Sequence, residues 1–280
     1  MGVFLWSNDM SWFAYLSKAK AQQVYRYIEY QWQAQGAYRL HSPFVYHLYT
    51  KVMPHRHSAI GDRIEALKSR LRLSDEVVEI RDFGAGTAGK EQLVVNKPLA
   101  ELVRYVSRRR KEGELLYRLC THFQPKRCLE FGTHLGISGL YQCAALEQGS
   151  RFVTMEGAEA LAERARTHFA EFGYTPEILT GEFSGTLSTQ LDLATYKPDY
   201  VFIDGNHREQ ATLDYFHQVL PHIPNEGIII FDDIHWSAGM QRAWEEIIRH
   251  PEVTVSIDLF FLGICFIRRK QAKEHFILRF

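Results

Sequence analysis

The second part of the chain alternates strand-like and helix-like runs, and this alternation constrains the fold more than any other feature. Apolar runs predict strands at residues 127–131, 151–155, 176–180, 199–203, 227–231 and 253–257. Runs with helical spacing separate them, at residues 137–147, 158–172, 184–193, 208–220 and 239–249. Such alternation favours an α/β fold, a parallel sheet with helices on both faces. A last strand, residues 260–268, follows after a very short turn and predicts a closing antiparallel hairpin.

The first part of the chain has a different texture, mostly helical and rich in aromatic residues. Apolar residues at helical spacing predict a helix within residues 12–35, and Ser42 followed by Pro43 predicts a helix start. That helix would end near Val52. Further expected elements are helices at residues 60–71, 98–106 and 113–123, a short strand at 77–80 and a turn at 84–86. We therefore expect a helical N-terminal extension over residues 1–125 and a sheet domain over 126–280.

Composition excludes several classes of partner. Lys plus Arg and Asp plus Glu both number 33, so the net charge is zero and a sequence-independent grip on nucleic acid is disfavoured. The apolar N-terminal stretch is too short for a signal peptide or a membrane span. The four cysteines have no CxxC or metal-ligand spacing, which indicates free thiols and a cytoplasmic location.

Residues 129–138, Leu-Glu-Phe-Gly-Thr-His-Leu-Gly-Ile-Ser, read as a buried strand, a glycine-spaced turn and a helix start. An α/β sheet builds a cofactor site at this place. Gly132 and Gly136 suit a tight turn against a ligand, although turns without a ligand share the spacing. His134 interrupts the G-x-G-x-x-G pattern, which disfavours NAD and FAD. Glu130 suits a cationic ligand group, or it pairs with a nearby basic residue or amide.

Acidic residues follow the next two strands. Glu156 lies twenty residues after Gly136, at the end of the second strand of the sheet domain, where an acid can accept hydrogen bonds from both ribose hydroxyls. Glu182 and Phe183 follow the third strand, where a polar group and an aromatic edge could hold an adenine. That segment is also compatible with a simple turn.

Three aspartates, Asp204, Asp232 and Asp233, follow the fourth and fifth strands. Carboxylates that converge at one sheet edge repel one another unless a cation intervenes, and hard oxygen ligands favour Mg²⁺. The alternative is that one caps a helix, one bonds the cofactor and no metal binds. His207, three residues after Asp204, is a candidate general base because imidazole titrates near neutrality. It is otherwise a surface histidine.

Five segments in order resemble a class I S-adenosylmethionine-dependent methyltransferase, nearest to the catechol O-methyltransferase-like, small-molecule branch. They are Leu-Glu-Phe-Gly-Thr-x-x-Gly-x-Ser, Val-Thr-Met-Glu, Thr-Gly-Glu-Phe, Val-Phe-Ile-Asp-Gly-Asn-His and Ile-Phe-Asp-Asp-Ile-His-Trp. The resemblance covers about residues 127–268. It implies a Rossmann-like, seven-stranded methyltransferase sheet with a closing antiparallel hairpin, and S-adenosylmethionine as cofactor.

The resemblance also implies roles for individual residues. The cofactor-binding positions are Glu130, Gly132, Thr133, Gly136, Ser138, Glu156, Gly157, Glu182, Phe183 and Asp204. The metal positions are Asp204, Asp232 and Asp233, and the catalytic positions are His207 and Asp204. Two residues depart from the family pattern, because Asp233 stands where the catechol type has Asn and His207 where many members have Lys.

The expected activity is O-methylation of a small acceptor, with an aromatic compound as one candidate, beneath a lid of N-terminal helices and Trp236. The alternative from another class is a binding protein that holds the cofactor without turnover. An NAD-dependent oxidoreductase is disfavoured by His134 and by the closing hairpin. A nucleic-acid methyltransferase is disfavoured by the zero net charge. The sequence leaves the acceptor and the role of the extension open, and exposed N-terminal aromatics are compatible with a homodimer.

Overall fold

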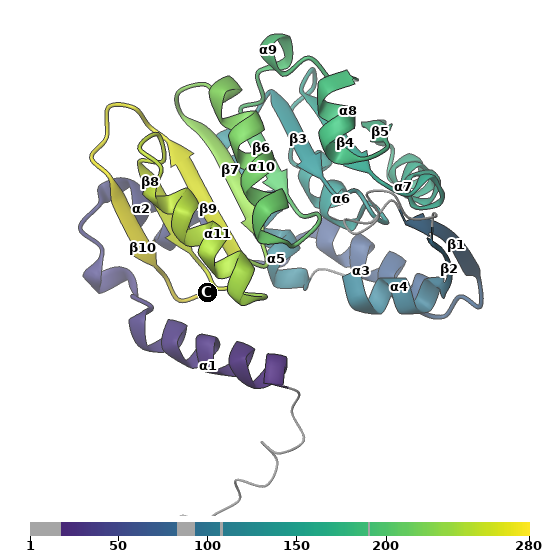
Figure 1. Ribbon diagram of the computed structural model, residues 1–280, viewed down its shortest axis with the longest axis horizontal. Coiled ribbons are helices and arrows are strands. Elements are labelled where there is room, and N and C mark those ends of the chain that lie inside the picture. The colour runs from purple at the N-terminus through teal and green to yellow at the C-terminus, as the bar shows by residue number, and fades with distance from the viewer. Residues whose placement is uncertain (1–17, 83–92, 107–108, 190) are drawn as a thin grey trace, which may run out of the picture.

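An eight-stranded sheet forms the centre of the molecule in the computed structural model, which describes residues 18–82, 93–106, 109–189 and 191–280 (Figure 1). The strand order is β10-β8-β9-β7-β6-β3-β4-β5. The strands are β3 (Arg127–Phe131), β4 (Arg151–Glu156), β5 (Glu177–Thr180), β6 (Tyr200–Ile203), β7 (Gly227–Asp232), β8 (Val255–Asp258), β9 (Leu262–Ile267) and β10 (Glu274–Ile277).

The predicted parallel sheet with a closing hairpin is confirmed. Strands β5, β4, β3, β6 and β7 are parallel neighbours, and β9 runs antiparallel to both β7 and β8. The sheet has one strand more than predicted, because β10 pairs in parallel with β8 at the sheet edge. Glu274 and His275 make β10 polar and partly exposed, so it lacks the apolar run that marks the other strands.

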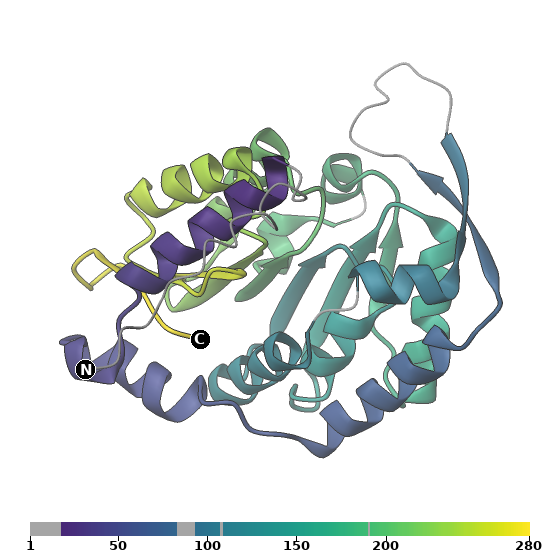
Figure 2. The same ribbon diagram turned by 90° about the horizontal axis from the view of Figure 1, so that it is seen from below.

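Helices cover both faces of the sheet, as Figures 1 and 2 show. They are α1 (Lys18–Gln33), η2 (Ala37–Arg39), α2 (Pro43–His47), η3 (Leu48–Val52), α3 (Ala59–Arg72), α4 (Leu99–Val106), α5 (Arg110–Phe123), α6 (Ile137–Cys143), α7 (Glu159–Glu171), α8 (Phe183–Thr189), α9 (Leu193–Tyr196), α10 (Glu209–Val219), η4 (Leu220–His222) and α11 (Ala238–Arg249). None of the helices in the described ranges is long and apolar enough to cross a membrane.

The period-two pattern of the strands decides which helices cover which face. Leu129 and Phe131 of β3 pack in one buried cluster with α8, α9, α10 and α11. Cys128, which points the other way, packs with α2, η3 and α5. Because successive side chains of a strand alternate between faces, a continuous apolar strand buries both sides.

The predicted helix over residues 184–193 is instead two helices, since Asp192 caps α9 by accepting hydrogen bonds from the N–H groups of Ala194 and Thr195.

The N-terminal extension shares its core with the sheet domain. Ile64 and Leu67 of α3 and Val103 of α4 belong to the same buried cluster as Leu140 of α6 and Phe169 of α7. The extension also forms a separate antiparallel hairpin of β1 (Val77–Asp82) and β2 (Leu93–Pro98). The strand at 77–80 is thus confirmed and β2 was not foreseen. The turn predicted at residues 84–86 lies outside the described residues, and the boundary at residue 125 stays a prediction.

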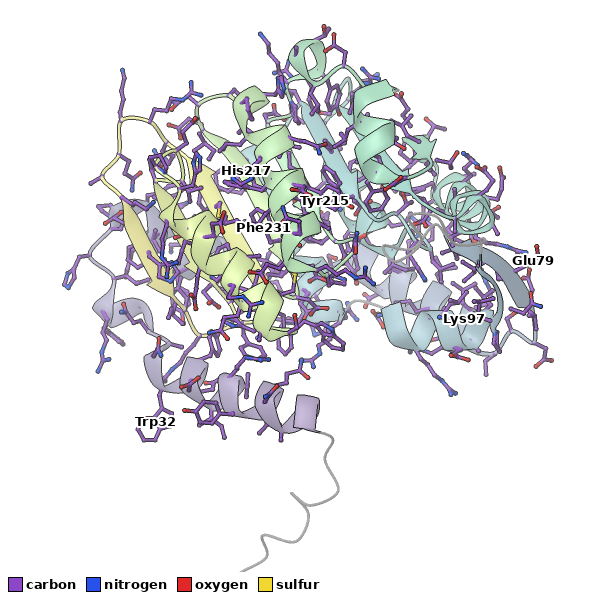
Figure 3. The ribbon with its side chains drawn as sticks, in the orientation of Figure 1. Trp32, Glu79, Lys97, Tyr215, His217 and Phe231 are labelled. Carbon is purple, nitrogen blue, oxygen red and sulfur yellow. The ribbon has the colours of Figure 1, made fainter. Side chains whose placement is uncertain are left out.

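Helix α1 docks at the β10 edge of the sheet (Figure 2). The Tyr30 hydroxyl donates to the carbonyl of Leu278, and Gln35 forms a parallel bridge with Leu278. On the outer side of α1, Trp32 is 86% exposed and points away from the sheet (Figure 3). The part of the predicted helix that precedes residue 18 lies outside the described residues.

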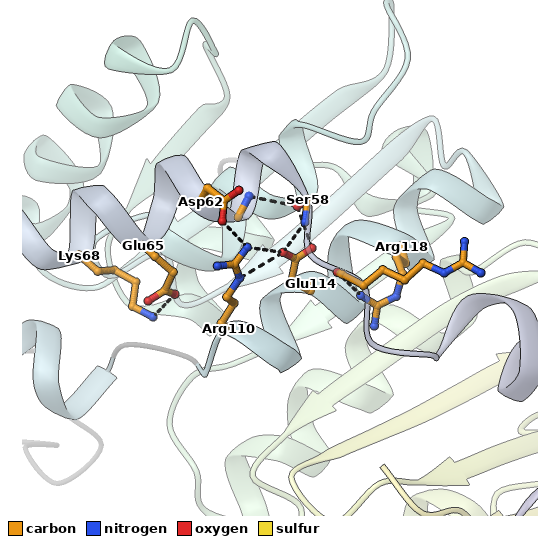
Figure 4. Close-up of polar contacts among 9 residues, drawn as sticks. Ser58, Asp62, Glu65, Lys68, Arg110, Glu114 and Arg118 are labelled. Carbon is orange, nitrogen blue, oxygen red and sulfur yellow. Dashed lines mark hydrogen bonds and ion pairs between the residues drawn. The ribbon is translucent and has the colours of Figure 1, made fainter.

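A buried carboxylate fastens α3 to α5 (Figure 4). The Glu114 side chain is fully buried and accepts hydrogen bonds from the backbone N–H and the hydroxyl of Ser58, at 2.9 and 2.8 Å. Arg110 lies 3.4 Å from the same carboxylate and 2.6 Å from Asp62. A buried charge is tolerated only when it is paired and hydrogen-bonded, and Glu114 meets both conditions.

We predict that Glu114→Gln lowers the free energy of unfolding by about 1–3 kcal/mol, because an amide N–H₂ then faces the buried donors of Ser58. Chemical denaturation measures the loss. The matched control is Glu171→Gln, which breaks an exposed pair with Arg70 and should change stability by less than about 0.5 kcal/mol. Equal stability of the two variants would contradict the structural role of Glu114.

Candidate active site

A pocket of about 740 Å³, its open mouth included, lies at the carboxyl ends of β3, β4 and β6. It is the place where parallel α/β sheets bind ligands. Its lining residues are Val103, Gly132, Thr133, His134, Leu135, Ile137, Ser138, Glu156, Phe183, Asp204, Gly205 and Asn206. The structure thus brings Gly132, Thr133, Ser138, Glu156, Phe183 and Asp204 together, as the sequence predicts.

The floor of the pocket depends on Gly132. This residue has φ +96°, and a Cβ built on it would lie 2.3 Å from the backbone oxygen of Asp204. Any other residue would clash with the loop after β6, so only glycine lets the two loops approach this closely. Gly136, with φ +76°, faces the Phe169 ring of α7 and does not line the pocket. It therefore shapes the start of α6.

Glu130 lies beneath the pocket, fully buried. Its carboxylate accepts hydrogen bonds from Ser138 Oγ at 2.7 Å, Gln142 Nε2 at 2.8 Å and Thr154 Oγ1 at 2.7 Å. Because Thr154 donates to Glu130, Thr133 Oγ1 must donate to Thr154 across 2.7 Å. Glu130 does not line the pocket, so a direct contact with a cationic ligand group has no support in the geometry. The hydrogen-bond donors that satisfy the Glu130 carboxylate come from the protein itself and not from a ligand.

A polar pair one helical turn apart gives a sequence signal for this network. Ser138 and Gln142 stand four residues apart on an otherwise apolar helix, and Thr154 lies opposite Glu130 in the sheet register. Residues at this spacing share one helix face.

Glu156 is held at the pocket wall by two backbone donors. Its Oε2 accepts the N–H of His134 at 2.7 Å, and its Oε1 accepts the N–H of Ala158 at 3.0 Å. These bonds fix the carboxylate where it lines the pocket, and a carboxylate is an acceptor for hydroxyl donors. The geometry suits the diol of a ribose.

The segment after β5 contributes one residue to the pocket. The Phe183 ring lies edge-on to Phe131 at 6.0 Å and close to Gly205, where an added Cβ would lie 2.5 Å from the ring. Phe183 therefore forms an apolar wall suited to a planar base. Glu182 is exposed, and neither it nor Gly157 lines the pocket.

An acidic group with one imidazole lies at the ends of β6 and β7. Asp204, His207 and Asp232 each offer one ligand atom, and these atoms lie within 4.8 Å of one another. The His207 Nε2 lies 3.8 Å from Asp204 Oδ1. Among the described residues this group excludes Asp233, the third acid of the predicted metal set. Asp233 has φ +52°, and its N–H donates to the Phe261 carbonyl at 2.7 Å.

His134 is the pocket residue that sequence reasoning used only to disfavour other cofactors. Burial, together with the positive charge of Lys97 on β2, lowers the pKa of His134 from 6.5 to about 4. The imidazole is therefore neutral near pH 7. Lys97 is 37 positions away in the sequence, and no sequence pattern indicates that the β1–β2 hairpin brings its charge close enough to act on His134.

Comparison with known proteins agrees with this geometry. Residues 129–234 match the family model described as a methyltransferase domain. The search of curated proteins found no significant match.

Several solved structures share the fold. The O-methyltransferase TomG of Streptomyces achromogenes, involved in tomaymycin synthesis and bound to S-adenosylmethionine, is 21% identical, with a TM-score of 0.52 and coverage of 80% of this chain and 95% of that one. An O-methyltransferase of Bacillus cereus, in complex with S-adenosylhomocysteine, is 19% identical, with a TM-score of 0.51 and coverage of 79% and 96%. A methyltransferase of Podospora anserina, bound to S-adenosylhomocysteine, is 16% identical, with a TM-score of 0.55 and coverage of 96% and 99%.

At these identities the structural similarity shows the fold. The predicted Rossmann-like methyltransferase fold is confirmed, and residues 129–234 form a methyltransferase domain. The class of enzyme predicted from the sequence, a methyltransferase, is confirmed with it. The roles of the individual site residues remain predictions, which the following proposals make testable.

We predict that His134 makes the protein less stable in acid. Above pH 6.5 the imidazole is neutral in both states; as the pH falls from 6.5 to about 4, the unfolded chain gains a proton that the folded one rejects. The free energy of unfolding should therefore fall by up to about 1.4 kcal/mol per pH unit from this residue.

Denaturation across that pH window, compared between the wild type and His134→Asn, measures the contribution. Asparagine tolerates the left-handed backbone at this position (φ +47°), keeps the N–H that bonds Glu156 and does not titrate. The variant should lose less stability on acidification. Parallel curves would contradict the assignment.

Proposed function

We propose that this protein transfers a methyl group from S-adenosylmethionine to an oxygen of a small-molecule acceptor. One observation carries the proposal: the pocket at the ends of β3, β4 and β6 combines the Gly132 turn, the fixed carboxylate of Glu156 and the Phe183 wall. Solved O-methyltransferases with the same fold, bound to S-adenosylmethionine or its product, support it. Asp204 lines the pocket and His207 is not among its lining residues, so one of the two proposed catalytic side chains reaches the cofactor pocket, and we favour an enzyme over a binding protein without turnover.

The pocket residues would divide the cofactor between them. Glu156 would accept hydrogen bonds from the ribose hydroxyls, and Phe183 would pack against the adenine. The turn from Gly132 to Ser138 would hold the methionine end. In the reaction the acceptor oxygen bonds to the methyl carbon as the carbon–sulfur bond breaks, and S-adenosylhomocysteine and a proton leave. The protein's main contribution is to hold the two atoms in line, about 3–3.5 Å apart.

Asp204, His207 and Asp232 would hold a divalent cation beside the acceptor, since two carboxylates and an imidazole converge there. When bound, such an ion supplies Lewis-acid polarisation of the acceptor hydroxyl. The imidazole makes this set better suited to Mn²⁺ or Zn²⁺ than to Mg²⁺, which prefers oxygen ligands. If no ion binds, His207 remains the candidate base for the acceptor proton, with Asp204 beside it.

Location and assembly belong to the same proposal. The four cysteines are free and three of them, Cys120, Cys128 and Cys265, are buried, which supports a reducing cytoplasmic compartment. Tyr25, Ile28 and Trp32 are exposed along one face of α1, which supports a homodimer through this helix. The zero net charge supports a small-molecule partner rather than nucleic acid.

We predict that calorimetry detects binding of S-adenosylhomocysteine and that Glu156→Gln weakens it at least about tenfold, because hydrogen bonds to a charged acceptor are lost. Glu159→Gln is the matched control, a neighbouring carboxylate that is exposed at the start of α7. Failure of the wild type to bind would overturn the proposed function. Unchanged affinity in Glu156→Gln would overturn the ribose role.

We predict that the wild type binds Mn²⁺ more tightly than Mg²⁺, by about tenfold or more, in calorimetric titrations. Asp232→Asn should abolish measurable binding, and His207→Ala should remove the preference for Mn²⁺. Asp214→Asn, an exposed aspartate of α10, is the control. If methyl transfer survives EDTA and no ion binds, the cation site is wrong and the base role of His207 becomes the one to test.

A further inference from the structure

A second pocket opens between α1, the residue before α5 and the turn that joins β8 to β9. Its open volume is about 710 Å³, and its lining residues are Gln23, Val24, Tyr27, Arg109, Phe260 and Phe261. We call it the aromatic pocket. The methyltransferase family model matches residues 129–234, so every lining residue lies outside the matched segment.

The walls of the aromatic pocket are rings in fixed positions. Tyr27 meets Phe260 edge-on at 4.9 Å, and Phe260 meets Phe261 edge-on at 4.9 Å. Phe260 adopts φ +71°, which is unusual for a bulky residue, and its N–H donates to Asp258 Oδ1 at 2.8 Å. Backbone in a rarely populated region persists where its surroundings hold it, and it gathers at ligand sites. The rings are therefore arranged before any ligand arrives.

Arg109 gives this pocket its charge. Among the described residues of the lining it is the only charged one, it is exposed, and its guanidinium lies 4.3 Å above the Phe261 ring. Within the described residues no carboxylate forms an ion pair with Arg109, whereas its neighbour Arg110 is paired with Asp62 and Glu114. A pocket with one unneutralised guanidinium favours an anionic ligand group.

The sheet register places the aromatic pocket beside the acidic group. Asp232, the last residue of β7, lies opposite Leu262, the residue after Phe261. The N–H of Asp233 donates to the Phe261 carbonyl at 2.7 Å. Neighbouring strands are about 4.8 Å apart, so the phenylalanine pair lies one strand from Asp232 and about two from the end of β6 at Asp204. A ring packed on the phenylalanine pair can therefore direct a hydroxyl substituent toward Asp232.

We infer that the aromatic pocket is the acceptor subsite and that it selects an aromatic acceptor carrying an anionic group. The ring packs against Tyr27, Phe260 and Phe261, the anion pairs with Arg109, and the acceptor hydroxyl points to Asp204 and Asp232. That the bound molecule is a methyl acceptor rests on the proposed function. The charge preference does not, because it follows from the pocket alone.

A neighbouring cavity has a different charge pattern, and the comparison shows that the positive charge is a particular property of the aromatic pocket. The cavity between α1 and α11 has Arg26, Glu29, Glu245 and Asp258 in its lining, so charges of both signs meet there. Its lining selects no charge. In the part of the chain that the structure describes, the aromatic pocket is lined by one charged residue, the cationic Arg109.

The test compares two probes of one shape, 3,4-dihydroxybenzoate and its neutral methyl ester, by calorimetry on the full chain saturated with S-adenosylhomocysteine. The wild type should bind the acid about tenfold more tightly than the ester, which corresponds to about 1.4 kcal/mol. Added salt should reduce this preference, because the ion pair is partly exposed. Arg109→Gln should remove it and Arg109→Lys should keep part of it. The control is Arg72→Gln, an exposed arginine at the end of α3.

Equal affinity for acid and ester in the wild type overturns the inference, and so does a preference that persists in Arg109→Gln. Absence of binding of either probe to the S-adenosylhomocysteine-loaded protein also overturns it, and leaves the proposed function intact. If S-adenosylhomocysteine itself does not bind but the acid does, through Arg109, the anionic aromatic site stands and the proposed function fails. The wild-type comparison needs no variant, so a misfolded Arg109→Gln does not hide the answer.

Discussion

The close approach of two loops, one after β3 and one after β6, is the constraint on which the rest of the site depends. The backbone of Gly132 passes the carbonyl of Asp204 at a distance that leaves no room for a Cβ, and the N–H of Asp204 bonds the Phe131 carbonyl at 2.9 Å. This contact brings the glycine turn and the acidic residues together at the carboxyl ends of the strands. A wider separation would divide the pocket in two.

Below that contact, hydrogen-bond donors of the protein itself stabilise the buried carboxylates. Glu130 uses donors from α6 and β4, and Glu114 uses donors from the N-terminal extension. Each carboxylate therefore holds neighbouring helices and strands in a defined position relative to one another. A network of this kind rigidifies a site because every member is satisfied. The positions of Ser138 and Thr133 at the pocket wall follow from Glu130 beneath them, although Glu130 never faces the pocket.

The sequence predicted the sheet well because its strands are apolar and alternate faces, which is a local property. It missed β10, whose Glu274 and His275 resemble loop residues, and β2, which pairs with β1 in a separate two-stranded sheet. Site residues in the Gly132 turn and at Glu156 were predicted from spacing along strand ends. The burial of Glu130, the absence of Asp233 from the acidic group and the influence of Lys97 on His134 depend on side-chain directions and on long-range contacts. No spacing rule carries that information.

The contact between α1 and the edge of the sheet positions one wall of the proposed acceptor pocket, although this contact lies outside that pocket. Tyr27 reaches the aromatic pocket from the same helix whose Tyr30 holds the carbonyl of Leu278, beside the bridge from Gln35. Neither Tyr30 nor Leu278 touches the space a ligand would fill. Substitutions at the contact between α1 and Leu278 could therefore change which molecules this enzyme accepts, while every residue around the methyl donor stays unchanged.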